Sequence, residues 1–173
     1  MEDAVRHPTK TEIMSSLVNS SRNKAKSMSF PNNFDEVQWS DRDFYGWIDP
    51  RASHRAYLVT DHRSELVAVE FRVAAVDPIR TRGVMCNLCR SMRRSGEAAL
   101  FTAQKAGPAG KAANSVGTYI CVDFDCSLYV RNAKPLSDPQ PERSLFSETR
   151  IENLRRRLDG FLTRIVGASS AGR

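Results

Sequence analysis

The apolar positions near the two ends of the chain repeat at the spacing of an α-helix. Near the start, Thr9 and Glu12 have the spacing of a capping box, and apolar side chains follow on one side. We therefore predict a helix over residues 9–28. Near the end, apolar residues return every three or four positions, at Ile151, Leu154, Leu158, Phe161, Leu162 and Ile165. This stripe predicts an amphipathic helix over residues 147–166 that packs along one side.

The first part of the chain between these helices combines an aromatic stretch with a predicted hairpin. Aromatic side chains are dense at Phe34, Trp39, Phe44, Tyr45 and Trp47. Such a density is typical of a core. Residues 55–60 and 65–74 are rich in branched and aromatic side chains, and a polar turn over residues 61–64 separates them. We expect these two segments to pair as antiparallel strands.

Residues 97–132 predict a second hairpin and a short helix. The strand candidates, residues 97–105 and 115–122, are separated by a loop over residues 106–110, whose glycines and proline are expected to exclude regular structure. Residues 126–132 follow as a short helix with Asp125 available as its N-cap. Antiparallel hairpins beside an N-terminal and a C-terminal helix indicate an α+β fold.

Prolines at positions 135, 139 and 141 indicate a linker without a fold of its own before the last helix. We expect five parts: an N-terminal helix and linker (residues 1–33), a central domain (34–133), a Pro-rich linker (134–146), a C-terminal helix packed on the domain (147–166) and a disordered tail (167–173). A length of 173 residues fits one domain with such flanks.

The composition bears on location and partners. The first thirty residues hold no apolar region of a secretory signal, and no apolar run approaches the ~20 residues needed to cross a bilayer. We expect a soluble, cytoplasmic protein with no membrane partner. The net charge of +6 favours an acidic protein or RNA as partner. Acidic side chains gather over residues 34–50, whereas basic ones gather at Arg80, Arg82, Arg90, Arg93, Arg94, Lys105 and Lys111.

The four cysteines form two close pairs that predict a zinc site. Cys86 and Cys89 have C-x2-C spacing, and Cys121 and Cys126 follow after 31 intervening residues with C-x4-C spacing. A structural zinc ion takes four such ligands in a tetrahedron. The first pair follows Gly83, which permits tight bending, so it is expected to form a zinc knuckle. The second pair joins a strand end to a helix start, and together these parts predict a treble-clef zinc finger.

Two other interpretations of the cysteines stay open. A pair of disulfides is disfavoured in a reducing cytosol, and a C-x2-C redox site is usually set in a βαβ context. Four thiolates would close the metal shell, so the zinc is expected to be structural and not catalytic. The chain also has no phosphate-binding loop, no dinucleotide fingerprint and no nucleophile elbow, and its three histidines are dispersed. We therefore expect neither an enzyme nor a small-molecule substrate.

The segments around the cysteines resemble a known family. Cys86-Asn87-Leu88-Cys89, then Ser115-Val116-Gly117-Thr118-Tyr119-Ile120-Cys121, then Cys126-Ser127-Leu128-Tyr129 are similar to the C-terminal treble-clef zinc finger of the elongation-factor-G-binding proteins. These are the fusidic-acid-resistance type, also named the FBP domain. The resemblance covers roughly residues 10–165, and the string from Ser115 to Cys121 is far more specific than any C-x2-C pair.

The resemblance implies a function in translation. Family members grip elongation factor G and help it leave the ribosome, so this chain is expected to bind that factor, with the four cysteines as zinc ligands and Tyr119 as an aromatic contact. It departs from the larger resistance proteins, which carry a helical bundle before the zinc domain, and resembles a short, finger-only member. The alternative is an RNA-binding or ribosome-binding finger in which the basic stretch, including Arg93, Arg94 and Lys111, neutralises phosphates of ribosomal RNA.

Overall fold

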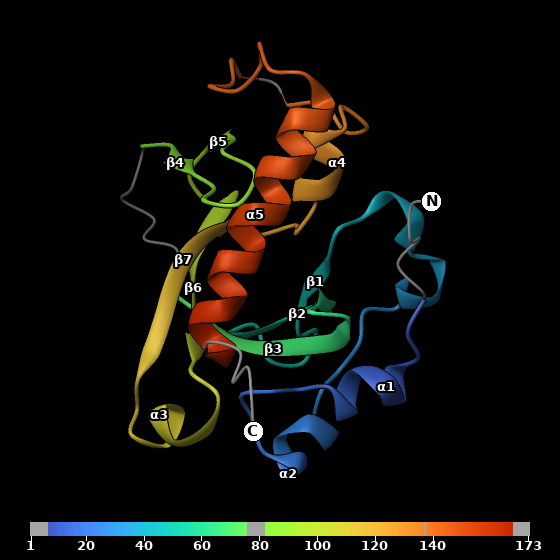
Figure 1. The fold of residues 1–173 in the computed structure, drawn as a ribbon, viewed down its shortest axis with the longest axis vertical. Helices are drawn as coiled ribbons and strands as arrows, with labels where there is room; N and C mark the ends of the chain where they lie inside the picture. Colours follow the sequence, from blue (N-terminus) through green and yellow to red (C-terminus); the bar gives the residue numbers. More distant parts are fainter. Residues whose placement is uncertain (1–6, 76–81, 137, 168–173) are drawn as a thin grey trace.

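The computed structural model describes residues 7–75, 82–136 and 138–167 (Figure 1). Its centre is an antiparallel sheet with the order β1-β2-β3-β6-β7. The strands are β1 (Tyr45–Ile48), β2 (Arg55–His62), β3 (Glu65–Val73), β6 (Ala98–Gln104) and β7 (Ser115–Cys121). A second, two-stranded sheet pairs β4 (Val84–Met85) with β5 (Met92–Arg93). The helices are α1 (Lys10–Ser15), α2 (Arg22–Lys26), α3 (Gly107–Lys111), α4 (Cys126–Val130) and α5 (Ser147–Val166), with 3-10 turns at Phe34–Glu36 and Trp39–Asp41. The predicted α+β class is confirmed.

Both predicted hairpins are present. In the β2–β3 hairpin, Arg63 and Ser64 form a tight turn with φ values of 53° and 66°. In the β6–β7 hairpin, the expectation of an irregular loop was wrong, because residues 107–111 form the single helical turn α3. Pro108 is tolerated there because the first turn of a helix does not need its N–H group.

The single N-terminal helix predicted over residues 9–28 was also wrong. The predicted Thr9–Glu12 capping box is present, but α1 ends at Ser15 and α2 begins only at Arg22. Between them the chain pairs with β3: the Val18 N–H donates to the Ala68 carbonyl at 3.0 Å, and the Ala68 N–H donates to the Ser16 carbonyl at 3.0 Å. Strand β6 pairs with β3 only at Arg72 and Val73. The segment between α1 and α2 therefore supplies hydrogen-bond partners for backbone groups of β3 that would otherwise lack them.

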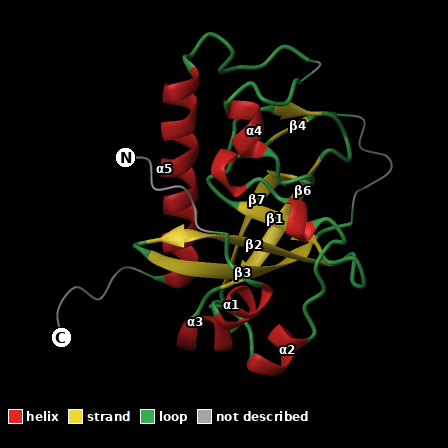
Figure 2. Cartoon of the chain, turned by 90° about the vertical axis from the view of Figure 1, so that its right-hand side faces the viewer, coloured by secondary structure: helices red, strands yellow, loops and turns green. Residues whose placement is uncertain are grey.

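The sheet has two covered faces. On one face, α1, α2 and the 3-10 turns enclose an aromatic core, which is formed by Ile13, Met28, Phe34, Trp39, Tyr45, Trp47, Tyr57, Val59 and Ala68. On the other face, Phe161 of α5 stacks on Phe71 of β3 with ring centroids 6.0 Å apart. Figures 1 and 2 both place α1 and α2 on the opposite side of β3 from α4.

Helix α5 has the bounds and the buried stripe that the sequence predicts. Among the described residues of the 134–146 linker there is no helix or strand, yet the linker is attached: Gln140 exchanges hydrogen bonds with both the N–H and the carbonyl of Met92, at 2.7 and 3.3 Å. The predicted tail lies outside the described residues after Gly167, and the division into five parts stays a prediction. In the described part of the chain, no helix combines the length and apolar character needed to span a bilayer.

Candidate metal centre

The first cysteine pair lies at the tip of the β4–β5 hairpin. The Cys86 N–H donates to the Ser91 carbonyl at 2.9 Å, and the Arg90 N–H donates to the Cys86 carbonyl at 2.9 Å, which closes a tight turn around Cys89. We expected Gly83 to permit a tight bend, but in the structure its lack of a side chain has a different role. A Cβ atom at Gly83 would lie 2.9 Å from the Arg93 carbonyl oxygen, so the absence of a side chain allows the two hairpin arms to approach.

The second pair joins the end of β7 to the start of α4. A tight turn follows Cys121, in which the Phe124 N–H donates to the Cys121 carbonyl at 3.0 Å and Phe124 has a φ of 55°. Cys126 is the first residue of α4, preceded by Asp125 at the predicted N-cap position. The Asp125 side chain makes no capping bond, because its carboxylate pairs with Arg42 at 2.9 Å and Lys134 at 2.7 Å.

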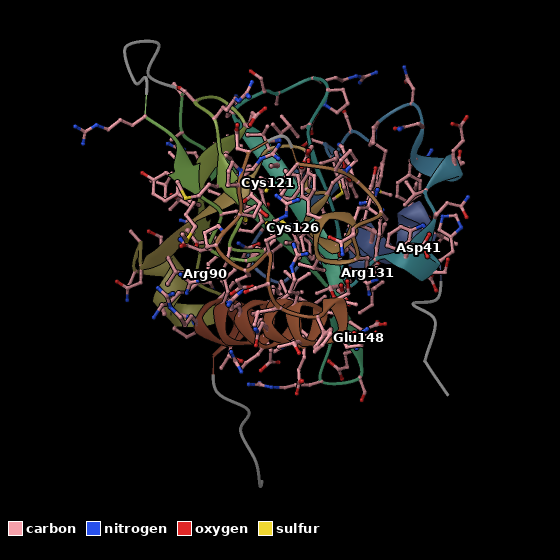
Figure 3. The ribbon with its side chains drawn as sticks, turned by 90° about the horizontal axis from the view of Figure 1, so that it is seen from above. Asp41, Arg90, Cys121, Cys126, Arg131 and Glu148 are labelled. Carbon is pink, nitrogen blue, oxygen red and sulfur yellow. The ribbon has the colours of Figure 1, made fainter. Side chains whose placement is uncertain are left out.

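The four sulfur atoms converge in the interior. All four cysteines are buried free thiols, and their Sγ atoms lie within 4.8 Å of one another. The Cys86–Cys126 and Cys89–Cys121 sulfur pairs are 3.6 and 3.7 Å apart. A tetrahedral zinc ion with bonds of ~2.3 Å requires sulfur atoms about 3.8 Å apart, whereas a disulfide requires about 2.05 Å. Figure 3 shows Cys121 and Cys126 together near the middle of the molecule. The donor set fits one zinc ion, as the sequence predicts.

The thiols at this centre are held in an environment that favours a bound cation. Hydrogen bonds from Cys121, Cys126 and Cys86 lower the pKa of Cys89 well below its usual value of 9.0. For Cys126, hydrogen bonds with Cys121 and Cys86, together with burial, raise the pKa. Four thiolates this close in a buried site repel one another strongly, so all four ionise together only when a divalent cation neutralises them.

Comparison with known proteins identifies the fold around this centre. Residues 12–165 match the family model of the FBP C-terminal treble-clef zinc-finger. The chain belongs to this family. No curated protein and no solved structure matches it. The resemblance carried by the cysteine segments is thereby confirmed, together with the treble-clef fold and the single zinc site. The FBP family is a family of binding domains, and its membership implies a zinc-finger protein that binds elongation factor G in general.

Hydrogen bonds around the metal site connect the zinc knuckle of this FBP domain to β7 and α5. Asn87 of the knuckle donates its backbone N–H to the Tyr119 carbonyl at 2.8 Å and its side-chain amide to the Thr118 hydroxyl at 2.9 Å. The Arg157 guanidinium of α5 donates to the Leu88 carbonyl at 3.2 Å. The knuckle is therefore fixed to β7 and to α5 by bonds that do not involve the metal.

Tyr119 lies on the outer face of the β6–β7 hairpin of the FBP domain. It is half-buried and stands opposite Leu100 in the strand register. The two line a cavity of about 260 Å³ together with Arg82 and Val84. At Gly117, two residues before Tyr119, an added Cβ atom would lie 3.3 Å from side-chain atoms of both Leu100 and Thr102, so these side chains pack close to the bare backbone. Tyr119 thus contributes to a shallow, partly apolar surface beside the zinc site.

The basic residues predicted to contact a partner do not form one surface in this FBP domain. Arg93 is only 8% exposed, and its guanidinium lies 4.8 Å from the ring centre of Tyr129 and 3.6 Å from the Asp123 carboxylate. Arg94 is exposed but forms two bonds to Asp138, at 3.1 and 3.2 Å.

Lys111 lies on α3, at the far end of β7 from Cys121. The strand between them spans roughly 20 Å. Of the remaining basic positions, Arg80 lies outside the described residues, whereas Arg82, Arg90 and Lys105 are exposed or half-exposed. Arg93 is therefore largely enclosed and the other basic positions are dispersed, and their contact with a partner stays a prediction.

Sequence reasoning missed a charge cluster around the buried Asp43, beside α4. The Asp43 side chain is 3% exposed and accepts hydrogen bonds from Arg131 at 2.6 and 3.1 Å and from Arg155 at 2.7 Å. Burial acts to raise the pKa of Asp43, but these bonds outweigh it and hold the pKa below its usual 3.8. The partners lie 88 and 112 positions along the chain, so no local signal in the sequence links them.

Proposed function

We propose that this protein binds elongation factor G through the outer face of the β6–β7 hairpin, with Tyr119 as a central contact, and helps the factor leave the ribosome. The observation that carries the proposal is the half-exposed Tyr119 beside Leu100 on a strand that ends in a zinc ligand. Aromatic anchors surrounded by apolar neighbours dominate the affinity of protein interfaces. The metal holds this strand rigid, so the strand loses little conformational freedom on binding.

A non-enzymatic role in the cytoplasm agrees with the site. Four sulfur ligands leave no open coordination position for water or substrate, and so the zinc acts on the shape of the protein alone. In this proposal the zinc finger is a rigid platform, and fusidic acid resistance would follow from removal of a stalled factor from the ribosome.

The first experiment measures binding of purified, zinc-loaded protein to elongation factor G by calorimetry. Tyr119→Ala is expected to weaken binding by roughly thirtyfold or more, the effect of removing a hot-spot aromatic. Lys26→Ala, which truncates an exposed side chain of α2, is the matched control and should leave the affinity unchanged. Zinc content and melting temperature of each variant confirm that it is folded. Absence of binding by the metallated wild-type protein would end the proposal.

Salt dependence separates this function from the RNA-binding alternative. A protein contact with an apolar centre should weaken little between low and high salt, whereas binding through several phosphates falls steeply on a log-log plot. The burial of Arg93 and the pairing of Arg94 with Asp138 favour the protein partner. Tight, salt-sensitive binding of ribosomal RNA that survives Tyr119→Ala would favour the alternative instead.

The second experiment tests release from the ribosome. Ribosomes stalled with elongation factor G and fusidic acid are mixed with the protein and sedimented, and the factor is measured in pellet and supernatant. We expect the wild-type protein to move the factor to the supernatant and Tyr119→Ala to leave it in the pellet. If the wild-type protein binds the free factor yet leaves the stalled complex intact, its role is binding without release.

A further inference from the structure

Arg150 is a buried cation without a counter-charge. It lies at the end of the first turn of α5 and is 5% exposed. Its guanidinium donates to two neutral acceptors, the Asn132 side-chain oxygen at 3.0 Å and the Tyr129 carbonyl at 3.1 Å, and its Nε–H has no partner. Across residues 7–75, 82–136 and 138–167, no carboxylate lies within ion-pairing distance of it.

The two acceptors leave the positive charge of Arg150 without a negative charge to neutralise it. An arginine cannot discharge by losing its proton, and a buried charge without an opposite charge costs several kcal/mol. The amino end of α5 adds to the cost because it carries positive partial charge, and the Tyr129 carbonyl at the end of α4 offsets only a fraction of a unit charge. An arginine in this position therefore points to a ligand of negative charge.

A cavity lies beside Arg150. Its volume is about 420 Å³, and Arg150, Arg143, Lys134 and Asp138 are among its lining residues. Lys134 is engaged with Asp123 and Asp125, and Asp138 is engaged with Arg94. Two cations of the cavity therefore stay without an ion-pair partner in the described structure: Arg150 in its wall and Arg143, which is exposed.

Part of the cavity wall is apolar, and so is the chain next to Arg143. Pro135, Leu136 and Pro139 form part of the wall. Between Arg143 and Arg150 the chain carries Leu145 and Phe146, which are 41% and 80% exposed and are the exposed large hydrophobic residues of the described chain. A phosphate backbone offers nothing to such apolar side chains, whereas a peptide supplies a carboxylate and an apolar neighbour together.

We propose that the groove between residues 134–136 and 138–143 and the start of α5 binds an acidic peptide segment of a protein partner, with one carboxylate received by Arg150 and Arg143. Charge-assisted bonds from guanidinium to carboxylate are strong and directional. Phe146 then packs on an apolar residue beside the acidic one. Where the partner is elongation factor G, this inference rests on the proposed function and adds a second contact region to the surface around Tyr119.

The first test uses a blocked peptide, Gly-Glu-Leu-Glu-Gly, and its twin in which glutamine replaces both glutamates. The readout is the NMR resonance of the Arg150 Nε–H in the zinc-loaded protein. We expect a saturable shift with the acidic peptide and none with the neutral twin. Arg143→Gln should weaken binding roughly fivefold, the effect of losing one charge-assisted bond at an exposed site. Arg156→Gln, on α5 but outside the cavity lining, should not weaken it.

Three results would overturn the proposal that the groove binds an acidic peptide: no shift with either peptide, equal shifts with both, or a shift caused only by a short RNA oligonucleotide. The last result would assign the site to phosphate. A second arm measures elongation factor G binding by Arg143→Gln and Arg156→Gln. If the wild-type protein fails to bind the factor, the proposed function fails, while the peptide titration still decides the groove. If the factor binds both variants and the wild type equally, the groove plays no part in that complex, and its assignment to this partner is wrong.

Discussion

The two ends of the sheet are stabilised by different chemistry. Around β1, β2 and β3 (residues 7–73, the aromatic half), Phe34, Trp39, Tyr45 and Trp47 contact one another with ring centroids 5.2 to 6.4 Å apart. Around β4 to β7 and α4 (residues 82–136, the zinc half), the centre holds four cysteine sulfurs surrounded by ion pairs. The aromatic half has a core without a metal, whereas the apolar core of the zinc half is built around the four cysteines that hold the metal.

The halves share an apolar core, in which Phe71 contacts Phe101 with ring centroids 5.7 Å apart, but the backbone pairing between them is short. Strands β3 and β6 pair at only two positions, Arg72 with Thr102 and Val73 with Phe101. Helix α5 spans the junction, because it stacks on Phe71 of the aromatic half and bonds to the Leu88 carbonyl of the zinc half. The following predictions test whether the short backbone pairing lets the two halves be destabilised separately or whether the shared core couples them.

Removal of zinc should have the largest effect. Chelation, or Cys126→Ser, is expected to remove about 10 kcal/mol or more of apparent binding energy and to unfold residues 80–132. Amide hydrogen exchange followed by mass spectrometry should show loss of protection in β6, β7 and α4. Both tryptophans lie in the aromatic half, so tryptophan emission should change much less. A simultaneous collapse of both signals would show that the halves form one cooperative unit.

Phe34→Ala is the reciprocal change in the aromatic half. Phe34 is 2% exposed and contacts the rings of Phe30, Trp39, Tyr45 and Trp47. Its truncation should cost about 3 to 5 kcal/mol in urea unfolding followed by tryptophan fluorescence. Zinc stoichiometry should stay at one per chain. Phe146→Ala, which truncates an exposed ring, is the control and should change stability by less than about 0.5 kcal/mol. Loss of zinc in Phe34→Ala would show that the aromatic half supports the metal site.

Gly46→Ala should strain the junction between the halves. A Cβ atom at Gly46 of β1 would lie 2.3 to 2.8 Å from the ring of Phe124, which belongs to the turn between Cys121 and Cys126. The Phe124 ring packs against Phe101, which opposes its displacement, so thermal or urea unfolding should show a loss of about 2 to 3 kcal/mol. The control is Gly160→Ala in α5, where nothing lies within 4 Å of the added atom. It should gain about 0.5 to 1 kcal/mol, and a similar loss in both variants would contradict the argument.

The features predicted from the sequence are those with local signals. The cysteine pairs, the β2–β3 turn and the apolar stripe of α5 each depend on residues a few positions apart. The split between α1 and α2 could not be predicted in this way, because the segment after Ser15 leaves the helix to bond with Ala68 and Glu70, some fifty positions away. Tertiary pairing there outweighs a good helical pattern.

The charged residues were hardest to assign for the same reason. Arg93 belongs to a basic stretch in the sequence, yet the Tyr129 ring and the Asp123 carboxylate enclose its guanidinium. Arg150 did carry a signal, since a cation in the first turn of a helix opposes the helix dipole, but only the structure shows that it is buried. The sequence locates charge along the chain, and the fold decides which charges stay available.

Asp43→Asn should have the smallest effect and a pH dependence of its own. Asp43, from the aromatic half, binds Arg131 after α4 and Arg155 of α5, so it is an ionic link across the junction. Because its pKa is lowered in the folded state, its contribution is complete above the unfolded pKa and is lost as pH falls below about 4. We expect the variant to be about 1.5 kcal/mol less stable at pH 7, with the difference shrinking at low pH.

Asp138→Asn is the matched control, because its pair with Arg94 is exposed and should contribute too little to resolve. The measurement is urea unfolding of the wild type and both variants at about five pH values between roughly 2.5 and 7. A stability difference between Asp43→Asn and the wild type that stayed constant at every pH would contradict the ionic link.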